Sequence, residues 1–159
     1  MLNIYSTSIL TKNEAGVVSR VSNLFSGRGY SIESITASTT LDKEHSKITI
    51  VTTGDEKVIE QITKQLHRLI PIIKITEMKA DNSICHELMF VKIKVKDEDR
   101  AEVIKLIEIF GAKILNISQR EYIIQAVGDE NYIKSLIELL KPIGIKEMIC
   151  SGAVAISRS

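Results

Sequence analysis

The sequence is short of the residues on which several classes of function depend. Only 4% of its 159 residues are aromatic, and it contains three histidines, two cysteines and two prolines. The cysteines, Cys85 and Cys150, are far apart and outside any CxxC spacing, so we expect free thiols in a reducing compartment. His45, His67 and His86 stand alone, and the adjacent Cys85 and His86 have no further ligands at metal spacing. A zinc site is therefore not expected.

An excess of one charge and long apolar runs are also missing. The 21 basic and 20 acidic residues are mixed along the chain and give a net charge of +1, which leaves no electrostatic footprint for nucleic acid or a membrane surface. No apolar run has the length of a membrane span, and residues 1–10 lack the basic start and cleavage site of a signal peptide. We expect a cytoplasmic protein without nucleic-acid or membrane partners.

No residue pattern typical of an active site is present. The segment Gly27-Arg28-Gly29 starts like a dinucleotide-binding fingerprint, but Ile32 occupies the third glycine position and the segment leads out of a helix into a strand. No nucleophile lies in a GxSxG or comparable motif, and Asp42, Glu44, Asp97 and Asp99 lie where turns and helix starts normally carry acids. We expect no catalytic residues, no metal and no cofactor on this chain, and a small enzyme is the least favoured class.

The patterns that are present predict an α+β protein built from two similar halves. In residues 1–78, β-prone segments and helices with apolar residues at three-and-four spacing follow one another in the order βαββαβ. The same order then repeats. In the first half Gly54-Asp55-Glu56 precedes a helix that Pro71 closes, and in the second half Gly128-Asp129-Glu130 and Pro142 have the same places.

The polar segment KADNS, residues 79–83, is the predicted linker between two ferredoxin-like domains at residues 1–78 and 84–159. A half of this size is near the limit at which a single core is marginal, so each half is expected to bury surface against a neighbour. Both helices of a βαββαβ unit usually cover one face of an antiparallel sheet, which leaves the other face and the edges open. A homodimer is the expected way to cover them.

Residues 11–35, TKNEAGVVSRVSNLFSGRGYSIESI, predict a ligand-binding element. Asn13 is expected to cap a helix through its side-chain oxygen, and the amides of residues 14–17 would otherwise lack partners. Gly16 lets a small carboxylate approach the backbone, helped by the positive end of the helix dipole. An ordinary capped helix explains the same residues and is, on physical grounds alone, the commoner case.

RNA binding is a weaker alternative for this fold type. RNA-binding modules of the same architecture stack bases on aromatic side chains of their strands. The corresponding strand KITIVTT, residues 47–53, contains no aromatic residue. The composition therefore disfavours this class.

The sequence closely resembles the small regulatory subunits of acetolactate synthase (acetohydroxyacid synthase). The resemblance spans the whole chain and is most specific in LFSGRGYSIES, in the helix GDEKVIEQITKQLHRL and in the ending CSGAVAISRS. In that family the N-terminal half is an ACT domain, a ferredoxin-like module that pairs into a dimer and binds an effector amino acid, usually valine, at the interface. The C-terminal half is a second ferredoxin-like domain.

The resemblance implies a non-catalytic regulatory subunit. Its partner would be the catalytic large subunit, a separate protein that depends on thiamine diphosphate and is expected to hold magnesium and FAD as well. The small subunit usually activates its partner and confers feedback inhibition by valine in branched-chain amino-acid biosynthesis. A stand-alone ACT-type amino-acid sensor without a synthase partner is the alternative.

The resemblance also implies an effector site, formed by Asn13, Ala15, Gly16, Val17, Val18, Ser31 and Ile32. Asn13 and Gly16 match the family's asparagine and glycine. The backbone amides of residues 15–18 would hold the valine carboxylate. From the second chain of the dimer the family typically presents an asparagine where this chain has Ser31, and Ile32 would supply a backbone group. Because the shorter hydroxyl would reach the effector through water, the preference among valine, leucine and isoleucine stays open.

Overall fold

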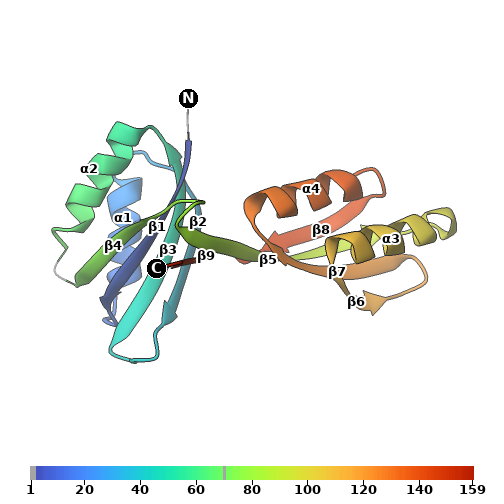
Figure 1. Ribbon diagram of the computed structural model, residues 1–159, viewed down its shortest axis with the longest axis horizontal. Helices are drawn as coiled ribbons and strands as arrows, with labels where there is room; N and C mark the ends of the chain where they lie inside the picture. Colours follow the sequence, from blue (N-terminus) through green and yellow to red (C-terminus); the bar gives the residue numbers. More distant parts are fainter. Residues whose placement is uncertain (1–2, 70) are drawn as a thin grey trace. The chain divides into compact units, whose positions relative to one another are not determined.

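The computed structural model describes residues 3–69 and 71–159. These residues form two compact units. The first unit runs to Cys85 and takes in Gly152–Ser159 as well, while the second unit is His86–Ser151. Each unit contains two helices and a mainly antiparallel sheet in the order βαββαβ (Figure 1). The predicted α+β class with two ferredoxin-like folds is therefore confirmed. No helix in the described ranges is both long and apolar enough to cross a membrane.

The first unit has two helices on one face of a four-stranded sheet (Figure 1). Its elements are β1 (Asn3–Lys12), α1 (Val17–Ser26), β2 (Ile32–Thr39), β3 (His45–Gly54), α2 (Glu56–Leu66) and β4 (Ile72–Met78). The strand order is β2-β3-β1-β4, and all neighbours are antiparallel. β2 and β4 are consequently the edge strands of this sheet.

Alternation along the strands decides which face of the first sheet forms the core. Ile9 on β1 lies opposite Ile48 on β3, and both are fully buried beneath the helices. Because side chains alternate between faces, Ser8 and Thr49, which are also paired, lie on the opposite face. The core is completed from the helices by Val17, Val21, Phe25, Ile59, Ile62 and Leu66.

The second unit repeats the arrangement. Its elements are β5 (Ser83–Lys94), the 3₁₀ turn η1 (Asp97–Asp99), α3 (Arg100–Phe110), β6 (Lys113–Ile117), β7 (Glu121–Gly128), α4 (Glu130–Leu140) and β8 (Ile145–Cys150). The strand order is β6-β7-β5-β8. The first strand of this unit, β5, is therefore a central strand, as β1 is in the first unit. Its core contains Met89, Val91, Ile93, Ile124, Leu136 and Leu140, all fully buried.

The two Gly-Asp-Glu segments begin helices as predicted, and their aspartates make equivalent hydrogen bonds. Asp55 Oδ1 accepts a hydrogen bond from the amide of Val58 at 3.0 Å, and Asp129 Oδ1 accepts one from the amide of Tyr132 at 2.8 Å. Each aspartate is the N-cap of its helix, α2 and α4 respectively. Gly111 is the C-cap of α3 with φ of +63° and ends that helix.

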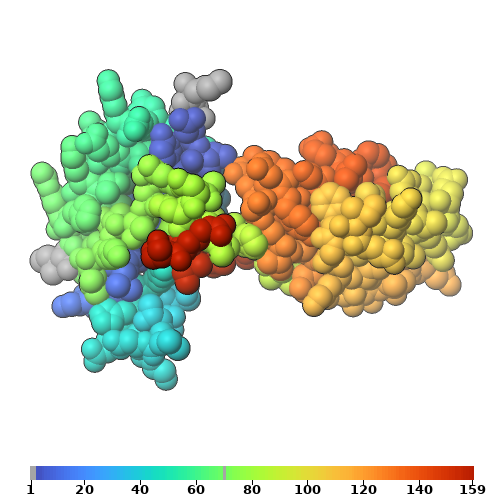
Figure 2. All heavy atoms as spheres, in the orientation of Figure 1, coloured from blue at the N-terminus to red at the C-terminus, as the bar shows by residue number. Residues whose placement is uncertain are grey.

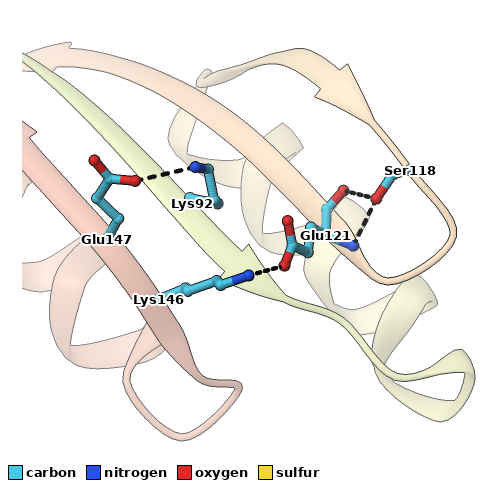
Figure 3. Close-up of polar contacts among 5 residues, drawn as sticks. All are labelled: Lys92, Ser118, Glu121, Lys146 and Glu147. Carbon is cyan, nitrogen blue, oxygen red and sulfur yellow. Dashed lines mark hydrogen bonds and ion pairs between the residues drawn. The ribbon is translucent and has the colours of Figure 1, made fainter.

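Ion pairs link strands of the second sheet, one between the neighbours β5 and β8 and one across β5 between β8 and β7 (Figure 3). Lys92 Nζ lies 3.0 Å from Glu147 Oε2, and Lys146 Nζ contacts Glu121 Oε1. The Glu147 carboxylate raises the pKa of Lys92, and the hydrogen bond from Lys146 lowers the pKa of Glu121. Ser118 Oγ also bonds the backbone of Glu121. Because these groups are exposed, each pair adds little to stability.

The C-terminal tail departs from the predicted division of the chain. Residues 84–159 were expected to form one domain, whereas Gly152–Ser159 group with the first unit. Within the tail, β9 (Val154–Ser157) pairs with β5, and the Arg158 amide donates to the Asn82 carbonyl at 2.8 Å. Figure 2 shows the tail, in red, packed onto the surface of the first unit. A strand of four residues lacks the periodicity from which a strand is predicted.

Candidate effector site

The entry to α1 is a turn that contains Gly16. This glycine has φ of +81°, in the left-handed region, and a Cβ atom at this position would meet nothing within 4 Å. The helix begins at Val17, directly after it, and no side chain caps the helix. The expected cap by Asn13 is therefore wrong. The left-handed glycine moves the start of the helix further along the chain than the cap pattern indicates.

Asn13 instead connects the α1 entry to the turn between β2 and β3. Its Nδ2 donates to the carbonyl of Lys43 at 3.0 Å, and its Oδ1 accepts from Ser46 Oγ at 3.0 Å. Its backbone amide donates to the carbonyl of Glu44 at 2.7 Å. The asparagine side chain therefore orders the pocket wall and the neighbouring turn together.

The β2–β3 turn is further held by Asp42. Its Oδ1 accepts from the amide of Glu44 at 3.0 Å, and its Oδ2 lies 2.7 Å from His45 Nδ1. The hydrogen bond from the Glu44 amide, followed by that from His45, lowers the pKa of the Asp42 carboxyl. Asp42 is consequently ionised at neutral pH and acts as an acceptor that fixes the turn.

A pocket of about 250 Å³ lies beside the α1 entry. Residues from the four segments around it form its lining: Thr11, Lys12, Asn13, Glu14, Val17, Val18, Ala37, Ser38, Thr39, Ser46 and Ile48. One side chain of each charge, Lys12 and Glu14, lies beside hydroxyl and apolar groups. Such a mixture fits a small zwitterion with an aliphatic side chain better than it fits a purely apolar or purely anionic ligand.

Unused backbone donors lie next to this pocket. Within residues 3–69 and 71–159, the amides of Ala15, Gly16 and Val18 donate no backbone hydrogen bond, and the amide of Val17 reaches the carbonyl of Glu14 only at 3.4 Å. The first turn of every helix leaves such amides. Here they lie beside a pocket and next to an exposed glycine, so they are accessible to a carboxylate.

The structure brings some of the predicted site residues together and leaves others apart. Asn13, Val17 and Val18 line the pocket, and Ala15 and Gly16 lie in the adjoining turn. Ser31 and Ile32 lie at the opposite end of β2 from Thr39, which at ~3.3 Å per residue is roughly 23 Å away. Within one chain they do not belong to this pocket.

Sequence reasoning missed the contribution of β2 and β3 to the pocket. Ala37 and Thr39 line it because β2 pairs with β3 in a register that sets them opposite Ile48 and Ser46. No local motif marks these residues. The pairing of two strands decides their position.

Metal-binding groups and disulfides contribute nothing to this site. Among the described residues, no group of three or more histidine, cysteine, aspartate or glutamate side chains is placed to hold a metal ion. In the same part of the chain Cys85 and Cys150 form no disulfide, and burial followed by repulsion from Glu87 raises the pKa of the Cys150 thiol.

The βαββαβ fold with a pocket at the entry to its first helix defines an ACT-type domain. Residues 7–74 match the family described as an AHAS small subunit-like ACT domain. Residues 86–159 match the family described as the small subunit of acetolactate synthase. The chain belongs to the acetolactate synthase small-subunit family.

Individual relatives cover nearly the whole chain. The acetolactate synthase small subunit of Mycobacterium leprae is 39% identical over 157 residues, which are 99% of this chain and 93% of that protein. The probable acetolactate synthase small subunit of Archaeoglobus fulgidus is 40% identical over 97% of this chain and 96% of its own length. A crystal structure of the acetolactate synthase small subunit from Thermotoga maritima matches with a TM-score of 0.87 and 34% identity, covering 99% of this chain and 98% of that chain.

Proposed function

We propose that this chain is the regulatory subunit of an acetolactate synthase, which activates the catalytic large subunit and makes it sensitive to valine. Membership of the small-subunit family supports the partner. The observation that carries the effector is the pocket of about 250 Å³ with its unused amides in the ACT domain. In this proposal the chain has no catalytic residue and no cofactor, and thiamine diphosphate, magnesium and FAD belong to the catalytic subunit.

The pocket suggests an orientation for the amino acid. Its carboxylate would accept hydrogen bonds from the amides of Ala15, Gly16 and Val18, at the positive end of the α1 dipole. Its ammonium group would lie towards Glu14, which lines the pocket. Val18 and the apolar atoms of Ala37 suit a branched aliphatic side chain.

A homodimer would complete the site. β2 is an edge strand, so its outer hydrogen-bonding groups are open to another strand. Antiparallel pairing of two β2 strands about a two-fold axis near Ile35 would set Ser31 and Ile32 of one copy beside Ser38 and Thr39 of the other. This arrangement explains why residues far from the pocket in one chain belong to the predicted site.

The proposed function is tested by acetolactate formation. The catalytic subunit is assayed with and without this chain over a valine titration. We expect the chain to raise the rate and valine to lower it again, through a coupling free energy of about 1–3 kcal/mol. Activation without valine sensitivity would support the role as partner of the catalytic subunit and would contradict valine as the effector. No change in rate would favour the stand-alone amino-acid sensor.

Two substitutions at Gly16 test the position of the carboxylate. Gly16→Asp and Gly16→Ala both place a side chain on a backbone with φ of +81°, at a similar strain of about 1–2 kcal/mol. Only the aspartate adds a negative charge near the unused amides. We expect Gly16→Asp to abolish valine inhibition with activation retained, and Gly16→Ala to keep both. Full valine inhibition in Gly16→Asp would contradict the site, and loss of activation in both variants would indicate misfolding.

A further inference from the structure

The helix-free face of the first sheet is lined by hydroxyl side chains. The strand register sets Ser8 on β1 beside Thr49 on β3 and Thr76 on β4, and sets Thr36 on β2 beside Thr49. Ser8 is only 3% exposed and Thr49 only 4%, although both helices of this unit pack on the opposite face. Another segment must therefore shield these hydroxyls from water.

The shielding segment is the tail, residues 152–158. The Ala153 amide lies 3.4 Å from Ser34 Oγ on β2, and β9 lies close to both β1 and β4. Ala155 in β9 is 9% exposed, so its side chain faces the sheet. At its end, Arg158 Nε donates to the carbonyl of Ser83 at 3.2 Å. The tail therefore crosses the hydroxyl face from β2 towards β4.

Gly152 allows the close approach of the tail to β2. Its φ is +84°, and a Cβ atom here would lie 2.9 Å from Thr36 Oγ1 and 3.1 Å from Ser34 Cβ. Any larger residue would be strained by the backbone conformation and would collide with β2. The attached position of the tail consequently requires glycine at residue 152.

The side chains of the tail add little to its attachment, which rests mainly on the pairing of β9 with β5 and on backbone hydrogen bonds. The side chains that face the sheet are those of alanines, which bury little apolar surface, whereas Val154 and Ile156 are 56% and 59% exposed. Thr36 Oγ1, beneath the tail, is buried and has no hydrogen-bond partner among the described residues. A buried hydroxyl without a partner destabilises the attached state, and water would satisfy it once the tail lifts. This hydroxyl opposes attachment of the tail, which the pairing of β9 with β5 favours.

The tail contacts the strand that carries the effector pocket. Ser34 and Thr36, which it contacts, precede the pocket residues Ala37, Ser38 and Thr39 on β2. The residue before the tail is held in the second unit, because the Ser151 amide donates to the carbonyl of Leu88 at 2.9 Å. The segment that contacts β2 therefore continues directly along the chain into the second unit.

From these contacts we infer that residues 152–158 form a detachable clamp on β2, whose attachment is coupled to occupancy of the effector pocket. The coupling rests on the proposed function, while the clamp itself rests on the contacts of the tail. A shift in tail attachment must change effector affinity, and effector binding must change attachment by the same factor, since the linkage is reciprocal.

The test compares the full chain with three variants. Hydrogen exchange of the peptide containing residues 152–159 reports attachment, and calorimetry reports the dissociation constant for valine. Gly152→Ala should speed tail exchange about tenfold, because it adds strain and a clash. Thr36→Val should slow it several-fold, because it removes the unpaired hydroxyl while keeping the shape. Ile156→Ser, on the exposed side of the tail, is the control and should change neither measurement.

Valine affinity distinguishes the clamp from the coupling. We expect Gly152→Ala and Thr36→Val to shift the valine dissociation constant in opposite directions by at least about threefold. Equal tail exchange in these variants and the unchanged chain would overturn the clamp. Altered exchange with constant affinity would overturn the coupling and leave the proposed function standing. If the unchanged chain binds no valine, the proposed effector fails together with the coupling, and tail exchange alone decides the clamp.

Discussion

Ser31 occupies the position at which a second chain is expected to contact the effector. The carbonyl of Ser31 accepts a hydrogen bond from Thr52 Oγ1, which fixes the backbone at the start of β2. The residue itself is exposed, so its side chain is available to a ligand held by another copy. Its short hydroxyl reaches less far than the asparagine amide that the family typically has there.

Replacing Ser31 by asparagine should therefore strengthen valine binding. A direct hydrogen bond to a charged ligand group would replace contact through water, and we expect the dissociation constant to fall about tenfold. Calorimetric titration of the dimer with valine measures the change. Ser31→Ala serves as the control and should bring no gain. Weaker binding in Ser31→Asn would show that this side chain does not face the effector.

Among the secondary-structure elements, α2 and α4 begin with the same Gly-Asp-Glu sequence, but the residues around the glycine pack differently. Asp55 and Asp129 cap α2 and α4 in the same way, and a glycine precedes each of them. A Cβ atom at Gly54 would have its nearest contact at 3.5 Å, from Val58 Cγ1, which is ordinary packing. At Gly128 it would lie 2.2 Å from Cδ1 of Tyr132. The packing therefore requires glycine at position 128, next to Tyr132, but not at position 54.

This difference predicts unequal effects for the same substitution. Tyr132 cannot move aside freely, because its hydroxyl donates to the carbonyl of Phe110 at 2.6 Å and the two ring centroids lie 5.5 Å apart. Gly128→Ala should lower the free energy of unfolding by about 1–3 kcal/mol, as overpacking does. Gly54→Ala should change it by less than about 1 kcal/mol. Denaturant unfolding of both variants measures the two values, and equal values would contradict the packing argument.

At the scale of the whole molecule, the chain passes from the first unit into the second and back again. The crossings lie after Cys85 and after Ser151, and β5 runs through the first of them. On the edge strand β2, residues 37–39 line the pocket, and Ser34 and Thr36, which contact the tail, precede them. In the proposed mechanism, the effector pocket and the tail contacts therefore share one strand.

The proposed pairing of two β2 edges predicts that valine binding depends on dimer formation. Light scattering should give twice the mass of one chain at working concentration. On dilution below the dimer dissociation constant, valine affinity should fall, because Ser31 and Ile32 of the second copy are then missing from the site. Valine binding measured over the same dilution series provides the check. Affinity that stays constant as the dimer dissociates would show that one chain forms the complete site.

The order of the elements and the ends of several helices could be predicted from the amino-acid sequence alone. Periodicity within a strand or helix, the caps Asp55 and Asp129 and the glycine stop at Gly111 depend on residues a few positions apart, so a single sequence reveals them. The remaining features depend on contacts that form in the folded chain. The hydrogen bonds of Asn13, the pocket wall at residues 37–39 and the return of the tail to the first unit all join segments that are distant in sequence. The register between strands and the packing of complete sheets fix such contacts, and no local pattern encodes them.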